Sequence, residues 1–128
     1  MFIKTLATGA IGAFALATSA LANEPFTHEA FSAAQAQNKP ILVEVAADWC
    51  PTCRRQAAVI GSLQDEQRFG GLAVFRVDYD DQRDVARQFR ATTQSTLIVF
   101  RGEDETGRAA GITSESDIAA LIATAYAD

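Results

Sequence analysis

Residues 41–53 read ILVEVAADWCPTC, and this stretch predicts both the fold and the chemistry of the chain. Residues 41–46 are apolar apart from Glu44 and rich in β-branched side chains, which is typical of a strand covered on both faces. Pro51 suits the first turn of a helix, because a backbone N–H at that position would have no partner within the helix. The stretch therefore predicts a buried strand that passes directly into a helix, with Cys50 and Cys53, the two cysteines of the chain, at the junction.

The spacing of the two cysteines favours a redox role over a structural one. A disulfide between Cys50 and Cys53 closes a very short loop, and the entropic stabilisation from a cross-link grows with loop length. At the start of a helix, backbone dipoles favour the thiolate of Cys50, and Arg54 and Arg55 add positive charge nearby. The thiolate is the attacking species in thiol-disulfide exchange, and Cys53 is placed to resolve the mixed disulfide. The alternative is a buried or metal-bound pair without catalysis.

Strands and helices alternate along the rest of the chain. Hydrophobic periodicity and capping residues predict helices at 27–38, 51–63, 81–89 and 114–126, and strands at 41–46, 72–79, 96–100 and 108–111. The last two strands are close enough to form a hairpin. This order predicts one α/β domain with a central mixed sheet of about four strands and helices on both faces.

In this context residues 47–53, ADWCPTC, together with the strand before them, resemble the active-site region of the thioredoxin-like superfamily. The resemblance extends in element order through nearly all of residues 26–126. A strand, Trp-Cys-x-x-Cys and a helix in succession form a specific combination, whereas Cys-x-x-Cys alone would not be specific. The resemblance implies a thioredoxin-like fold, a nucleophilic Cys50, a resolving Cys53 and Trp49 as a shield beside the disulfide. Exchange between these two cysteines and a partner is expected to need no bound organic cofactor.

Glu44 interrupts the apolar strand where thioredoxins carry a buried acidic residue beneath the resolving cysteine. Burial would raise the pKa of this carboxyl, which could then relay the proton of Cys53. The alternative is that Glu44 reaches solvent at the end of the strand.

Two positions depart from the thioredoxin pattern. Pro51-Thr52 stands between the cysteines in place of Gly-Pro, so the reducing potential of ordinary thioredoxins does not carry over directly. Ser95 occupies the position of the family's cis-proline, and since a cis bond before a non-proline residue costs about 2.5–4 kcal/mol, a trans Gln94–Ser95 peptide is expected. The residues predicted to contact substrate are Trp49, Pro51, Thr52, Ser95 and Thr96.

The loss of that proline also motivates a second hypothesis. In the family this proline keeps metal ions away from the cysteine pair. Without it, Cys50 and Cys53 could hold a soft metal such as copper or zinc, share a cluster across a dimer, or serve a redox-sensing module.

The N-terminus predicts export. Residues 1–22 combine Lys4, an apolar stretch and Ala20-Leu21-Ala22, as in a secretory signal peptide cleaved after Ala22. Cleavage would leave a domain of residues 23–128 with no stable insertion in the membrane. A retained membrane anchor is the alternative, because no charge stands between Lys4 and Glu24. Export would place the cysteine pair in an oxidising compartment, the periplasm.

The net charge argues against nucleic-acid binding, and the remaining polar residues argue against further metal sites. Eleven Lys and Arg against 16 Asp and Glu give a net charge of −5, which argues against nucleic-acid binding. His28 is expected to be exposed or capping rather than a metal ligand, and Tyr79 and Tyr126 are expected in the core or at its rim. A solvated loop and helix start, rather than a calcium loop, is expected for the acidic residues Asp78, Asp80, Asp81 and Asp84.

Together these features predict a periplasmic thiol-disulfide oxidoreductase that acts on protein thiols or disulfides. Trp49-Cys50 and Glu44 favour a protein-disulfide reductase, which in an oxidising compartment needs electrons, and a membrane thiol-reductant protein is the expected donor. A very low pKa of Cys50 would instead stabilise the reduced form and make the protein an oxidant.

Overall fold

The computed structural model describes residues 12 and 23–128 of the chain. Apart from Gly12, the predicted signal peptide or anchor lies outside the described residues. Among the described residues, no helix is long and apolar enough to cross a membrane.

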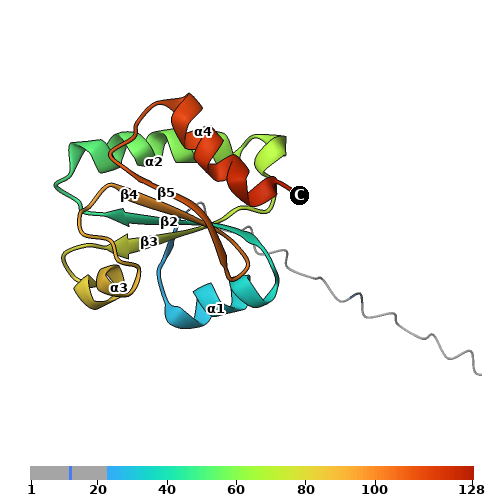
Figure 1. The fold of residues 1–128 in the computed structure, drawn as a ribbon, viewed down its shortest axis with the longest axis horizontal. Coiled ribbons are helices and arrows are strands. Elements are labelled where there is room, and N and C mark those ends of the chain that lie inside the picture. Colours follow the sequence, from blue (N-terminus) through green and yellow to red (C-terminus); the bar gives the residue numbers. More distant parts are fainter. Residues whose placement is uncertain (1–11, 13–22) are drawn as a thin grey trace, which may run out of the picture.

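The described domain is a five-stranded sheet between two layers of helices (Figure 1). Helices α2 and α4 cover one face of the sheet, and α1 and α3 cover the other. The strand order is β1-β3-β2-β4-β5, with β1, β3 and β2 parallel and β4 and β5 antiparallel to their neighbours. The elements are β1 (Glu24–Pro25), α1 (His28–Ala36), β2 (Pro40–Ala46), α2 (Pro51–Gln64), β3 (Ala73–Asp78), α3 (Arg83–Gln88), β4 (Thr96–Arg101), β5 (Asp104–Ala110) and α4 (Glu115–Ala123), with short 3₁₀ turns at Gln67–Phe69 and Thr124–Tyr126.

The α/β class, the mixed sheet and the helices on both faces are confirmed, with two corrections to the strands. The sheet has five strands rather than about four, because the two residues of β1 pair with Phe75 and Arg76 of β3. A strand of two residues leaves no alternation to read in the sequence. The second correction concerns β5, which starts at Asp104 rather than near residue 108. The first half of β5 is exposed and charged, so it shows no apolar pattern from which a strand could be predicted. Backbone pairing with β4 defines this part of the strand.

Strand β2 divides the core into two layers. Its alternate residues Ile41, Val43 and Val45 pack in an aromatic-rich cluster with residues of α1 and α3. Leu42 points to the opposite face and packs with residues of α2 and α4. Because side chains alternate along a strand, Glu44 and Ala46 lie on the same face as Leu42, beneath α2.

Candidate active site

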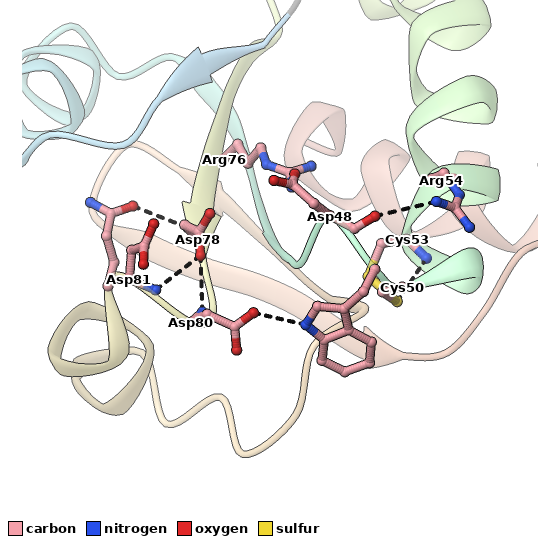
Figure 2. Close-up of polar contacts among 10 residues, drawn as sticks. Asp48, Cys50, Cys53, Arg54, Arg76, Asp78, Asp80 and Asp81 are labelled. Carbon is pink, nitrogen blue, oxygen red and sulfur yellow. Dashed lines mark hydrogen bonds and ion pairs between the residues drawn. A yellow bond between two sulfur atoms is a disulfide. The ribbon is translucent and has the colours of Figure 1, made fainter.

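The two cysteines lie where β2 gives way to α2, and they form a disulfide with a Cα–Cα distance of 5.3 Å. Cys50 is the N-cap of α2, and its Sγ accepts a hydrogen bond of 3.1 Å from the backbone N–H of Cys53 (Figure 2). Pro51 is the first residue of the helix, as predicted. The helix dipole and this N–H both favour negative charge on the Cys50 sulfur, so the geometry lowers the cost of forming its thiolate.

The arginines near the disulfide have defined partners. Arg54 donates a 3.3 Å hydrogen bond to the backbone carbonyl of Asp48, and Arg76 forms a 2.9 Å ion pair with the Asp48 carboxylate (Figure 2). Arg55 is exposed. Arg54 and Arg76 therefore approach the turn before the disulfide from two sides, one at its backbone and the other at its exposed acidic side chain.

Trp49 is the large apolar side chain that remains exposed in the described part of the chain, at 58% of its surface. Its indole Nε1–H donates a 2.8 Å hydrogen bond to the Asp80 carboxylate. The Asp78 carboxylate in turn accepts the backbone N–H groups of Asp80 and Asp81 at 2.9 and 3.0 Å (Figure 2). The acidic run thus orders a loop that holds the indole. The contact between Trp49 and Asp80 could have been anticipated from the sequence. Trp49 follows β2 and Asp80 follows β3, and because these strands are parallel neighbours, their carboxyl ends meet at one edge of the sheet.

Asp80→Ala is expected to free the indole of Trp49, because it removes the acceptor of the 2.8 Å bond. Trp49 is the single tryptophan of the chain, so the steady-state anisotropy of its fluorescence should fall. Asp81→Ala serves as the control, since only the backbone N–H of Asp81 is bound by Asp78. An unchanged anisotropy in Asp80→Ala would show that the hydrogen bond does not restrain the ring.

Glu44 is buried, with 2% of its surface exposed, so the alternative in which it reaches solvent is wrong. It stands opposite Arg76 of β3 and Leu97 of β4. Burial raises the pKa of Glu44 from its ordinary value of 4.5 to about 7, and the charge of Arg76 opposes part of that rise. Ala46, two residues further and about 7 Å along the same face, belongs to the buried cluster that contains both cysteines. Glu44 is therefore an ionisable group beneath the helix that carries the disulfide.

Ser95 directly precedes β4, at the end of that strand that pairs with the end of β2 leading to the disulfide. Its neighbour Thr96 pairs with Val45, and the antiparallel register places Ser95 opposite Ala46. The described residues contain no cis peptide bond, so the expectation of a trans Gln94–Ser95 bond is confirmed. Ser95 has a φ of 59°, in the left-handed region that few side chains other than glycine adopt. Such a conformation needs fixed contacts to hold it.

Gln56, which sequence analysis missed, supplies one of these contacts. It lies on α2 with 2% of its surface exposed, and its amide donates to the carbonyls of Ser95 (3.0 Å) and Ile112 (2.9 Å). The Ser95 carbonyl also accepts the backbone N–H of Gly111 at 2.9 Å. Gln56 therefore ties the helix of the cysteines to the loops before β4 and after β5. The available signal was a polar residue one turn after Cys53, on the buried side of the helix.

Gln56→Ala is expected to lower the free energy of unfolding by about 2–3 kcal/mol, because it removes two buried hydrogen bonds and leaves a cavity. Chemical denaturation of the oxidised protein measures this change. Gln88→Ala, at an exposed position of α3, is the matched control and should change stability by less than about 0.5 kcal/mol. Equal effects at the two positions would contradict the role given to Gln56.

The sequence model of the Thioredoxin family matches residues 22–124. The chain belongs to the thioredoxin family. Among curated relatives, a thioredoxin H-type of Brassica campestris is 30% identical over 90 residues, covering 70% of this chain and 72% of the relative. The bifunctional thioredoxin reductase/thioredoxin of Mycobacterium leprae is 35% identical over 81 residues, which is 63% of this chain but only 18% of that longer protein.

Solved structures agree with this assignment. The crystal structure of Trxlp from Edwardsiella tarda EIB202 superposes with a TM-score of 0.76 at 41% identity, covering 78% of this chain and 97% of that one. With the Cys50–Cys53 disulfide at the start of α2, the chain is a thioredoxin-family thiol-disulfide oxidoreductase. The thioredoxin family acts on protein disulfides, so protein thiols and disulfides are the substrate class.

The other positions predicted to contact substrate differ in exposure. Pro51 is exposed and Thr52 half-buried in the first turn of α2, next to the disulfide. Thr96 is 5% exposed, and its hydroxyl donates to the Thr93 carbonyl at 2.8 Å. Of these three side chains, Pro51 and Thr52 are thus available to a partner of this thioredoxin-family site, while that of Thr96 is engaged within the protein.

The remaining candidates, His28, Tyr79 and Tyr126, belong to no group of possible metal ligands among the described residues. His28 is exposed, with its ring against Phe26 at 5.2 Å. The hydroxyls of Tyr79 and Tyr126 donate to the carbonyls of Thr92 and Gly70, and burial raises the pKa of Tyr126 to about 12. Within the described ranges, no three His, Cys, Asp or Glu residues form a group that could hold a metal ion. A metal ion bound to Cys50 and Cys53 would therefore need further ligands that this group of described residues does not supply.

Proposed function

We propose that this chain is a periplasmic protein-disulfide reductase in which Cys50 is the nucleophile and Cys53 the resolving cysteine. The observation that carries the proposal is the position of the Cys50 sulfur, at the helix N-terminus and within 3.1 Å of the Cys53 N–H. Both features favour the thiolate over the thiol. The exposed ring of Trp49 beside it offers a partner protein an apolar contact surface.

The reaction starts from the reduced pair. The Cys50 thiolate attacks one sulfur of the partner's disulfide, which forms a mixed disulfide and releases the other partner sulfur as a thiolate that takes up a proton. Glu44 accepts the proton of the Cys53 thiol, and the Cys53 thiolate then attacks the Cys50 sulfur. The Cys50–Cys53 disulfide forms, the second partner sulfur leaves as a thiolate that takes up a proton, and Glu44 gives up its proton and returns to the carboxylate. The partner gains two electrons and the cysteine pair loses two.

The direction of electron flow follows from the compartment and the donor. In the periplasm the oxidised pair must be reduced again before each cycle, and a membrane thiol-reductant protein is the proposed donor. The proposal of export rests on residues 1–22, with cleavage after Ala22. N-terminal sequencing of the exported protein checks it: Asn23 is the expected first residue, and an intact leader in the membrane fraction would support the anchor instead.

The equilibrium reduction potential of the Cys50–Cys53 pair tests the reductase direction. It is measured on metal-free mature protein in glutathione or dithiothreitol buffers, with the redox state read from alkylated fractions. A reductase is expected near about −270 mV, the value of thioredoxin, because such a pair releases its electrons readily. A potential near about −120 mV would contradict the proposal and assign the protein the role of a disulfide donor.

A further inference from the structure

A hollow of about 380 Å³ lies between α3 and the segment that leads to β4. Three arginines line it, Arg83, Arg87 and Arg90, and no acidic residue does. All three arginines are exposed, while the two alanines that line the hollow with them, Ala86 and Ala91, are buried. The hollow is therefore a cationic depression in a chain whose net charge is −5.

The hollow adjoins the disulfide through Tyr79. This side chain lines the hollow and also packs against the cluster that contains Cys50 and Cys53. Its hydroxyl donates to the Thr92 carbonyl at 3.2 Å, and the guanidinium of Arg83 lies 5.1 Å from the centre of its ring. Tyr79 therefore forms one wall of the hollow and also packs against the cluster of the two cysteines.

A second path connects the hollow with the exposed indole beside the disulfide. Asp80 accepts the indole N–H of Trp49 and forms a 3.6 Å ion pair with Arg83. This leaves Arg87 and Arg90, whose guanidinium groups form no hydrogen bond or ion pair with the described residues. The charge of Arg90 also acts on the nearby Glu105 carboxylate, so Arg87 is the cation most available to an outside carboxylate and Arg90 adds to its field.

We propose that this hollow, lined by Arg83, Arg87 and Arg90, binds an acidic segment of the protein whose disulfide this chain reduces. Guanidinium groups match carboxylates in charge and in planar geometry, and a local positive field speeds the docking of an acidic partner. A partner with its target cysteine at Cys50 would rest on Trp49 and extend its acidic residues past Tyr79 into the hollow. This inference rests on the proposed reductase function and specifies its substrates.

Matched disulfide peptides test the proposal. Three peptides differ only in the residues flanking one cysteine, which are glutamate, glutamine or lysine, and stopped-flow Trp49 fluorescence gives the second-order rate of their reduction by the reduced protein. We expect the glutamate peptide to react about 10-fold faster than the glutamine peptide at low salt, and the preference to shrink at high salt. The lysine peptide should react slowest.

Two variants assign the preference to the hollow. Arg87→Gln should lose part of the preference for the glutamate peptide, and Arg87→Gln with Arg90→Gln should lose nearly all of it, while the glutamine peptide reacts at the wild-type rate. Lys39→Gln is the control, since it removes one exposed positive charge at the opposite end of β2 from Cys50. It should leave the preference intact.

The outcomes separate the inference from the function on which it rests. Equal rates for all three peptides, or a preference that survives in the double variant, would overturn the acidic-segment site and leave the reductase intact. Failure to reduce any of the peptides would instead count against the reductase function itself.

Discussion

Cys50→Ser is expected to reduce the rate of protein-disulfide reduction by about three orders of magnitude or more. A serine hydroxyl does not ionise near neutral pH, so the helix N-terminus and the Cys53 N–H would have no thiolate to stabilise. Insulin reduction with dithiothreitol as electron donor measures the effect, after subtraction of the rate with dithiothreitol alone. The fold should be unaffected, because the three-residue spacing makes the disulfide a minor contributor to stability.

Cys53→Ser is the matched variant, and it separates the roles of the two sulfurs. It keeps the attacking thiolate but removes the resolving thiol, so mixed disulfides between Cys50 and partner proteins should accumulate. They appear as thiol-sensitive bands on a non-reducing gel, and Cys50→Ser should give none. The opposite pattern, with trapped complexes in Cys50→Ser alone, would assign the attack to Cys53.

Glu44→Gln is expected to increase the free energy of unfolding by about 3 kcal/mol more at pH 8 than at pH 4. Burial raises the pKa of Glu44 from 4.5 to about 7, so the folded state binds its proton more tightly than the unfolded chain does. The stabilisation that the proton provides is complete below pH 4.5, falls as the pH rises towards 7, and is absent above it. Glutamine stays neutral and lacks this loss.

Denaturation curves of both proteins from pH 4 to pH 8 measure the difference, and all other titrating groups cancel in the comparison. Parallel curves would show that Glu44 ionises in the folded state as easily as in water. The same variant tests the proton relay, since the pH profile of exchange should lose its inflection near 7, the pKa of the carboxyl. An unchanged profile would remove Glu44 from the mechanism and leave it a structural role.

The parts of the fold that sequence reasoning found are those with local causes. Pro51 and the cysteines mark the start of α2, and the side chains of Thr27 and Ser114 cap α1 and α4 at the predicted positions. Each of these signals operates within one turn of the chain, so it is present in the sequence itself. The one acidic residue in an apolar strand likewise identified Glu44, whose burial is confirmed.

The parts that sequence reasoning missed depend on contacts between distant segments. Gln56 acquires its role from carbonyls 39 and 56 residues away, and the indole of Trp49 is held by an aspartate 31 residues further along. The arginine-lined hollow depends on how α3 packs against the sheet. Sequence patterns can mark Gln56 and the acidic loop as candidates, but they do not identify the partners, because the folded sheet brings those together.

The two edges of the sheet also bear on how the protein behaves in concentrated solution. An unpaired strand edge is a template for another chain, and long apolar edges lead to aggregation. Here one edge is β1, with only two residues, and the other is β5, whose sequence DETGRAA is charged and whose pairing with β4 is interrupted by a bulge at Val99/Phe100. In the part of the chain that the structure describes, neither edge strand is long, flat and apolar. Short or charged edge strands of this kind disfavour growth of the sheet by strand addition, so the protein should stay monodisperse at high concentration.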